Sequence, residues 1–359
     1  MKCLRLVLLT VLTSGCFLTG CSSASSNTAI SPVAKTGQTI SYCRGDDGDL
    51  QKGLAWPSPR FTDHGDGTVT DNLTGLEWAK APHAIPGNSG KFKWTGAIDF
   101  CGSLDYAGHS DWRLPSRKET MSIIDYGQQK PSLPAKHPFT GIQTVAFCGY
   151  WSSTTYIFQD SAAWCQGMGG SIGHPGKVAL RHAWPVRGGG KAISPVPKTG
   201  QHTIFHPGDD GKLQSGVVWP TPRFTDNGDG TMTDKMTGLE WAKAPHKIPG
   251  NAGGKKWKDG VEFCMDLDYA GYSDWRLPNA KEQESLVRCE KGDWGDKPSE
   301  WLNSCETPFI GILPQFYWVS TTNSVDTSFA LRVSMKIGYV RGNKKSGSFF
   351  VWPVRDGRK

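Results

Sequence analysis

The chain has 359 residues, more than one average domain. Glycine and proline together make up about 19% of it, below the share that marks low-complexity sequence, and 37% of the residues are hydrophobic, enough for a packed core. The formal charge of +7 comes from 40 basic and 33 acidic residues interspersed along the chain, which excludes the concentrated positive charge of a nucleic-acid-binding protein. The unusual feature of the composition is its 15 tryptophans.

The first twenty residues read as an export signal. Lys2 and Arg5 flank the start of an apolar run, residues 6–12, that is far shorter than the roughly 20 residues needed to cross a bilayer. The sequence Leu-Thr-Gly before Cys21 resembles a bacterial lipobox, and Ser22 after it favours the outer membrane. We therefore predict a signal peptide over 1–20, a lipid on Cys21, a tether over 21–37 and an outer-membrane lipoprotein. An ordinary signal peptide with a chance cysteine is the alternative.

The rest of the chain consists of two tandem copies of one sequence unit. Residues 30–38 recur at 193–201, and residues 60–88 agree with 223–251 at 24 of 29 positions. A repeat of this length is a whole domain rather than a solenoid unit. We predict a first domain over 38–188, a linker over 189–200 and a second domain over 201–359.

Each copy opens with a predicted β-hairpin. In the first copy it spans residues 60–70, with a turn at His64-Gly-Asp-Gly67. Carboxylates near this turn invite a calcium interpretation, but their spacing does not fit the calcium loop in which oxygens alternate before a glycine. We therefore expect a hairpin turn, no metal and no cofactor.

Two helices follow the hairpin. Apolar residues at helical spacing predict the first from Trp94 to Leu104 and, in the second copy, from Trp257 to Leu267. A capping box, Ser116 with Glu119, begins the second helix. Before it lies Asp111-Trp112-Arg113, which either binds an anionic sugar or, as we favour, forms internal ion pairs around a core tryptophan.

Tryptophan-rich strands end each copy, at 150–154 and 183–187 and again at 318–322 and 351–355. The pattern as a whole is α+β. Six tryptophan pairs occupy matched positions in the two copies, and we interpret them as core. Three tryptophans are unmatched and lie in divergent loops, where we expect contact with a partner: Trp164, Trp294 and Trp301.

The second copy also carries lysines that the first lacks. Those that we single out as ligand-binding candidates are Lys247, Lys255, Lys256 and Lys258. Such a cluster could hold a sulfated or phosphorylated polymer through attraction that salt weakens, and a solvated loop is the plainer interpretation.

The cysteines allow several pairings. Seven remain after Cys21, so at least one is unpaired within the chain. Cys289 and Cys305 bracket a loop of the second copy, and their pairing would contribute roughly 3 kcal/mol. In the first copy we expect Cys148 to pair with Cys165. A Gly-x-Ser-x-Gly match at 169–173 lacks a strand-to-helix turn, so we expect no enzyme activity.

Several long motifs carry a family resemblance. Phe-Thr-Asp-x-Gly-Asp-Gly-Thr, Thr-Gly-Leu-Glu-Trp, Gly-x-Ser-Asp-Trp-Arg-Leu-Pro and Trp-Pro-Val-Arg occur in both copies. They resemble the C-terminal domain family of the Legionella collagen-like adhesin, over residues 38–188 and 201–356. The resemblance implies a C-type-lectin-like fold, related to that of formylglycine-generating enzymes, and binding of sulfated glycosaminoglycans by a trimer.

We therefore expect two tandem C-type-lectin-like domains, each with a β-hairpin, two helices and tryptophan-rich antiparallel strands. The expected function is adhesion-type binding of a glycan or polyanionic polysaccharide by a lipoprotein held to the membrane by its lipid, with homo-oligomers as a further expectation and no nucleic acid as partner. A structural envelope protein that contacts other proteins is the first alternative, and an oxidase related to formylglycine-generating enzymes is the second.

Overall fold

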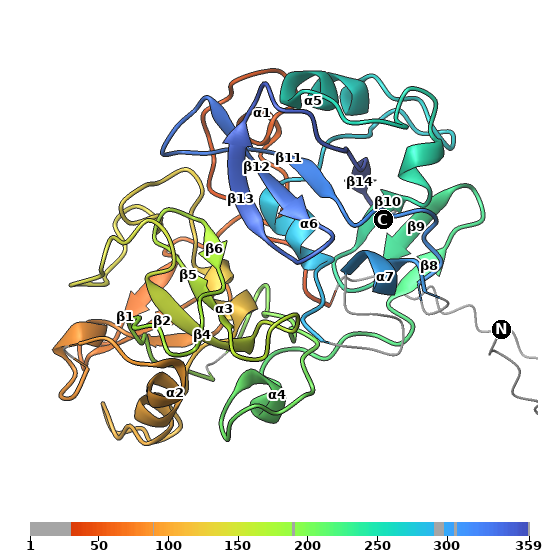
Figure 1. The fold of residues 1–359 in the computed structure, drawn as a ribbon. Helices are drawn as coiled ribbons and strands as arrows, with labels where there is room; N and C mark the ends of the chain where they lie inside the picture. Colours follow the sequence, from red (N-terminus) through yellow and green to blue (C-terminus); the bar gives the residue numbers. More distant parts are fainter. Residues whose placement is uncertain (1–29, 89, 189–190, 291–297, 305–306, 358–359) are drawn as a thin grey trace, which may run out of the picture.

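The computed structural model describes residues 30–88, 90–188, 191–290, 298–304 and 307–357. The predicted signal peptide and Cys21 lie outside these residues. Figure 1 shows the two sequence copies as two halves that lie against each other. No helix in the described ranges is long and apolar enough to span a membrane.

The two copies are built from the same elements in the same order. In the first copy they are α1 (Asp47–Leu50), β1 (Phe61–Asp63), β2 (Thr68–Asp71), β3 (Glu77–Ala79), η1 (Pro82–Ala84), α2 (Trp94–Gly102), α3 (Arg117–Ser122), β4 (Tyr150–Thr155), β5 (Ala163–Gln166), β6 (Ile172–Gly173) and β7 (Val186–Arg187). In the second copy they are α4 (Asp210–Leu213), β8 (Phe224–Asp226), β9 (Thr231–Asp234), β10 (Leu239–Ala242), η2 (Pro245–Lys247), α5 (Trp257–Met265), α6 (Ala280–Ser285), α7 (Pro298–Leu302), β11 (Phe316–Thr322), β12 (Phe329–Ser334), β13 (Val340–Lys344) and β14 (Val354–Asp356).

Each copy holds two small antiparallel sheets. The strand orders are β1-β2-β3-β7 and β4-β5-β6 in the first copy, and β14-β10-β9-β8 and β11-β12-β13 in the second. The predicted hairpin is confirmed, because Phe61 pairs with Asp71 across β1 and β2. The strand expected over 183–187 begins only at Val186, since Pro185 has no N–H with which to extend the ladder.

The two predicted helices are also present. α2 buries Trp94, Ala97, Ile98 and Cys101 on its inner face. The Ser116 side chain accepts from Glu119 N, and the Glu119 side chain accepts from Ser116 N, which confirms the capping box of α3. Asn279 and Glu282 form the same box at α6. The fold is thus α+β, with few helices and several small antiparallel sheets in two repeated halves.

One hydrophobic core runs through both copies. Its largest cluster contains Trp78 and Trp184 of the first copy together with Trp241 and Trp352 of the second. Two satellite clusters lie under α2 and under α5, and each also includes one residue from the opposite copy: Phe205 in the first and Cys43 in the second. Burial of apolar surface therefore stabilises the two copies together rather than one at a time.

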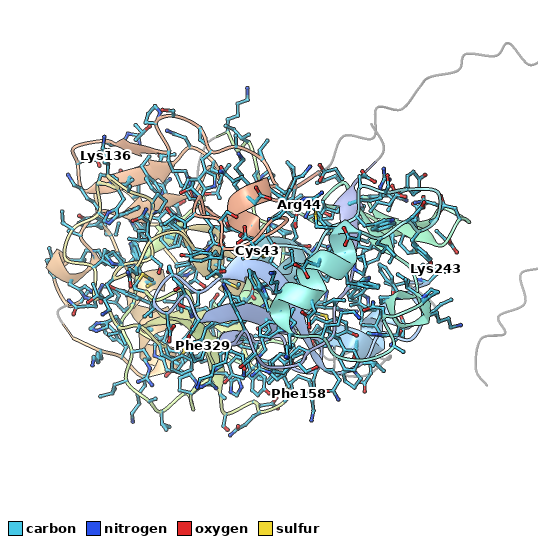
Figure 2. The ribbon with its side chains drawn as sticks, turned by 90° about the horizontal axis from the view of Figure 1, so that it is seen from above. Cys43, Arg44, Lys136, Phe158, Lys243 and Phe329 are labelled. Atoms are coloured by element: carbon cyan, nitrogen blue, oxygen red, sulfur yellow. A yellow bond between two sulfur atoms is a disulfide. The ribbon has the colours of Figure 1, made fainter. Side chains whose placement is uncertain are left out.

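The copies exchange their N-terminal arms, which we define as residues 38–50 and 201–213. α1 contacts β11 of the second copy, and α4 contacts β4 of the first. Figure 1 shows α1 beside α5 and α4 beside α2, and Figure 2 shows Cys43 and Arg44 of the first arm next to the helices and strands of the second copy. Each arm thus completes the copy to which it does not belong.

The segment expected to be a linker is held in place where the structure describes it. Ile193 N and Ser194 N both donate to Leu73 O of the first copy, at 3.0 and 2.8 Å. The Ser194 hydroxyl donates to Pro32 O at 2.6 Å. In the equivalent hydrogen bond from the first copy to the second, the Ser31 hydroxyl donates to Pro195 O, also at 2.6 Å. Residues 193–195 therefore form part of the contact between the copies.

Candidate ligand-binding groove

A groove of about 580 Å³ opens on the second copy, between the segment that leads into β8 and helix α7. Two tryptophans, Trp219 and Trp301, and three basic side chains, Lys198, Arg223 and Arg288, are among its lining residues. The groove therefore combines aromatic faces with positive charge.

The two tryptophans form the aromatic part of the groove. Their ring centroids lie 5.3 Å apart at an interplanar angle of 40°. The Trp219 indole N–H donates to Lys198 O at 2.9 Å, which fixes its ring while leaving it half-buried. Trp301 comes from α7, which belongs to the loop found only in the second copy.

The two arginines at the groove have different surroundings. Arg223 donates twice to the Asp234 carboxylate, at 2.8 and 2.7 Å, so its charge is balanced and its role is structural. Among the described residues, no carboxylate lies within ion-pair distance of the Arg288 guanidinium, which is held 5.9 Å from the Trp301 ring centroid. Within the described part of the chain, the donors of Arg288 are therefore not taken up by a carboxylate.

The matching region of the first copy differs at two positions. There Asp125 stands where the second copy has Arg288, and Thr39 stands where it has His202. The buried Asp125 carboxylate accepts from Gly127 N at 2.8 Å. Lys281 of the second copy lies 5.4 Å over the ring of Trp56, the counterpart of Trp219. The second copy thus has an arginine where the first copy has a buried carboxylate.

The structure places the four lysine candidates elsewhere. Lys255, Lys256 and Lys258 lie at the N-terminal end of α5, and Lys247 ends η2; none of them lines the groove. Lys255 donates to Gly250 O and lies 4.4 Å from the Phe263 ring centroid. Lys258 pairs with Glu262 at 3.5 Å on the exposed face of α5. Lys247 and Lys256 are exposed.

The interpretation of the unmatched tryptophans as exposed contact residues was wrong for Trp164 and needs revision for Trp301. Trp164 is 3% exposed, and its ring packs between Arg117 of the first copy at 4.7 Å and Tyr339 of the second at 5.7 Å. It therefore packs between the two copies. Trp301 is 5% exposed, so only an edge of it reaches the groove. Trp294 lies outside the described residues.

The Asp-Trp-Arg motifs are structural. Trp112 is buried, and Arg113 pairs with Glu119 at 2.6 Å rather than with its neighbour Asp111. Asp111 pairs instead with Arg187 at 2.7 Å. In the hairpin turn, the Asp66 carboxylate accepts from both the backbone N and the hydroxyl of Thr68, at 2.8 Å each. These carboxylates therefore have structural roles, in ion pairs and hydrogen bonds within the chain.

One of the two expected disulfides is present. Cys148 and Cys165 are bonded, with their Cα atoms 4.9 Å apart, which confirms that prediction. Cys289 is a buried thiol that accepts from Arg117 Nη1 at 3.7 Å, and its expected partner Cys305 lies outside the described residues. Cys101 and Cys264 are buried thiols on the inner faces of α2 and α5.

Sequence reasoning missed the two residues that face the groove most directly. Trp219 and its match Trp56 were both interpreted as core, yet both are only half-buried, so matched positions in the two copies do not by themselves indicate burial. Arg288 was overlooked, although its replacement of Asp125 is a charge reversal within an otherwise matched segment. A comparison of the two copies for charge reversals would have found it.

The repeated halves agree with a comparison to known families. Residues 67–187 and again residues 230–355 match the Lcl C-terminal domain. No match to the chain was found among curated proteins. The two matches cover well over half of the chain and coincide with its two structural halves. The chain therefore belongs to the Lcl C-terminal domain family, of which it carries two copies.

Proposed function

We propose that this chain is a surface-anchored lipoprotein that binds a glycan or sulfated polysaccharide in the groove of its second copy. The observation that carries the proposal is Arg288, a guanidinium without a carboxylate partner among the described residues, beside two tryptophans in a groove of about 580 Å³. A guanidinium holds a sulfate through two parallel hydrogen bonds, and an aromatic ring packs against the apolar face of a sugar.

The sequence before Cys21 supports the proposed lipid anchor, and the anchor would determine where in the cell envelope the groove lies. A lipid on Cys21 would hold the module at the outer membrane through the tether predicted over 21–37. We also propose that each copy has the C-type-lectin-like fold implied by the family resemblance; the support is its paired small sheets packed with two helices.

Binding is favoured over catalysis by the state of the matched cysteines. Burial raises the pKa of the Cys101 and Cys264 thiols well above the ordinary value, so both are protonated at neutral pH. A thiol reacts as its thiolate, and these two are neither ionised nor exposed. This argues against an oxidase that depends on the matched cysteines.

The test is binding of residues 22–359, with Cys21 absent, to an array that contains sulfated and neutral polysaccharides at low and high salt. We expect sulfated polysaccharides to bind most tightly and their binding to weaken as the salt concentration rises. Arg288→Asp, which introduces the residue that the first copy has at this position, should lower affinity at least about tenfold, because a charged hydrogen bond is lost and a repulsion is added.

A matched control separates the groove from the lysine cluster. The pair Lys256→Ala and Lys258→Ala removes two exposed charges outside the groove and should leave affinity within about twofold, since distant surface charges are screened. If these variants lose binding while Arg288→Asp keeps it, the ligand lies at α5 and the groove assignment is wrong. If no polysaccharide binds at low salt, the proposed function is wrong.

A further inference from the structure

A second cavity, of about 90 Å³, lies between the two copies. Matched residues from both copies line it in pairs: Pro32 with Pro195, Val33 with Val196, and Lys118 with Lys281. The cavity therefore lies at the contact between the two copies, and one of its lining residues, Arg223, also lines the groove described above.

The lining is mostly apolar, and its hydroxyl groups are already used. Ser31 and Ser194 donate to proline carbonyls across the copies, while Thr74 and Thr237 donate to Asp71 and Asp234. The hydrogen-bonding capacity left in the cavity wall is therefore that of its charged side chains.

Among the charged side chains that line the cavity, Lys118 differs from the other cations in its hydrogen bonding. It is 4% exposed, and its ammonium has no hydrogen-bond partner in the described part of the chain. Its matched residue Lys281 donates to Lys35 O at 3.2 Å and lies over the Trp56 ring. The third cation, Arg223, is balanced by Asp234.

One carboxylate serves two cations beside the cavity. Glu284, which stands where the first copy has Met121, accepts from Arg117 Nη1 at 2.7 Å, and the same oxygen lies 3.8 Å from Lys118 Nζ. Glu284 is hydrogen-bonded to Arg117, so Lys118 keeps an ion-pair contact with this carboxylate but no hydrogen bond. A buried ammonium in this position is costly unless a further anionic group reaches it.

We propose that the cavity binds a short-chain monocarboxylate, with its carboxylate on the Lys118 ammonium and its alkyl group against Val33, Val196 and Met236. The size sets the limit on the ligand: a cavity of roughly 150 Å³ holds benzene, so this one takes an acid with a shorter apolar part. One anionic group matches the cation of the described lining that has no hydrogen bond, and the apolar wall excludes a highly charged ion such as phosphate. A bound acid would touch both copies and so stabilise their contact.

The probe is sodium propionate, with propionamide as the neutral isostere and sodium chloride at the same ionic strength as the salt control. In residues 22–359 with methionine methyl groups labelled with ¹³C, propionate should shift the signals of Met121 and Met236, which line the cavity, in a saturable way. Met168, buried away from it, is the internal control. Propionamide and chloride should leave all three unchanged.

The variant test uses Lys118→Met, which keeps the length of the side chain and removes its charge, with the exposed Lys256→Met as its control. Lys118→Met should lower the affinity for propionate at least about tenfold, which is the loss expected when a hydrogen bond to a charged group is removed. The methyl titration of the unmodified chain decides the matter if Lys118→Met does not fold. Equal binding of propionamide, unchanged affinity in folded Lys118→Met, or no saturable shift at Met121 and Met236 would overturn the proposal.

Discussion

Gln38 of the first copy and Thr322 of the second are joined by a two-way pairing. The Gln38 side chain donates through Nε2 to Thr322 O and accepts through Oε1 from Thr322 N, both at 2.9 Å. Gln201 and Thr155 repeat the pairing in the opposite direction, at 3.1 and 3.0 Å. Each glutamine thus acts as one residue of an added strand at the end of an edge strand of the opposite copy, β11 or β4.

Loss of these pairings should loosen the arms. Gln38→Ala leaves the buried Thr322 N–H and C=O without partners, so we expect it to lower the free energy of unfolding by about 1–3 kcal/mol, and Gln201→Ala to do the same. Urea unfolding monitored by tryptophan fluorescence measures the change. Gln129→Ala, at an exposed position, is the control and should leave the midpoint unchanged. If the variants of Gln38 and Gln201 behave like this control, the arms contribute nothing to stability.

A cut between the copies should not separate them. We predict that a protease site inserted in place of residues 189–190 can be cleaved and that the two fragments then elute together in size-exclusion chromatography. The shared core and both exchanged arms hold them. In the double variant Gln38→Ala and Gln201→Ala, the cleaved fragments should separate at a lower urea concentration. Fragments that separate without denaturant would show that the covalent link, rather than the arms, keeps the copies together.

The sequence predicted the elements inside each copy but not how the copies combine. Hairpin, helices and capping box follow from local patterns such as Ser116 with Glu119, which act within one turn. The exchange of arms depends on pairings such as Gln38 with Thr322, 284 positions apart, for which a single sequence carries no local signal. Trp164 was misjudged for the same reason, because its burial comes from Arg117 and Tyr339 of different copies. Of the groove, Arg288 could have been recognised from its charge reversal, whereas the half-exposure of Trp219 could not.

Stability should depend on pH through two buried aspartates of the arms. Asp47 accepts from the Thr36 and Thr321 hydroxyls, and Asp210 accepts from Thr199 and Thr154. Burial raises the pKa of Asp47 to about 7 and that of Asp210 to about 6, from an ordinary value of 3.8. The folded chain therefore holds more protons than the unfolded chain in this window. The free energy of unfolding should fall as the pH rises from near 4 to about 7 and then level off.

The variants Asp47→Asn and Asp210→Asn test this assignment, because an amide keeps an oxygen acceptor without an ionisable proton. Combined, they should flatten the fall in stability between these pH values, as measured by urea unfolding at a series of pH values. The exposed Asp268→Asn is the control and should retain the slope of the unmodified chain. A double variant with an unchanged slope would assign the pH dependence to other groups, such as the histidines.

Substitution of Trp164 should mainly reduce stability, whereas substitution of Trp219 should mainly reduce polysaccharide affinity. Trp164→Ala removes a ring buried between the two copies and should lower the free energy of unfolding by about 3–5 kcal/mol, while polysaccharide affinity per folded molecule stays unchanged. Trp219→Ala removes a half-buried ring that lines the groove, so its stability loss should be smaller and its affinity loss clear. Urea unfolding and binding to a sulfated polysaccharide, measured on both variants, separate the two roles. A Trp164→Ala chain as stable as the original would mean that this ring is not buried between the copies.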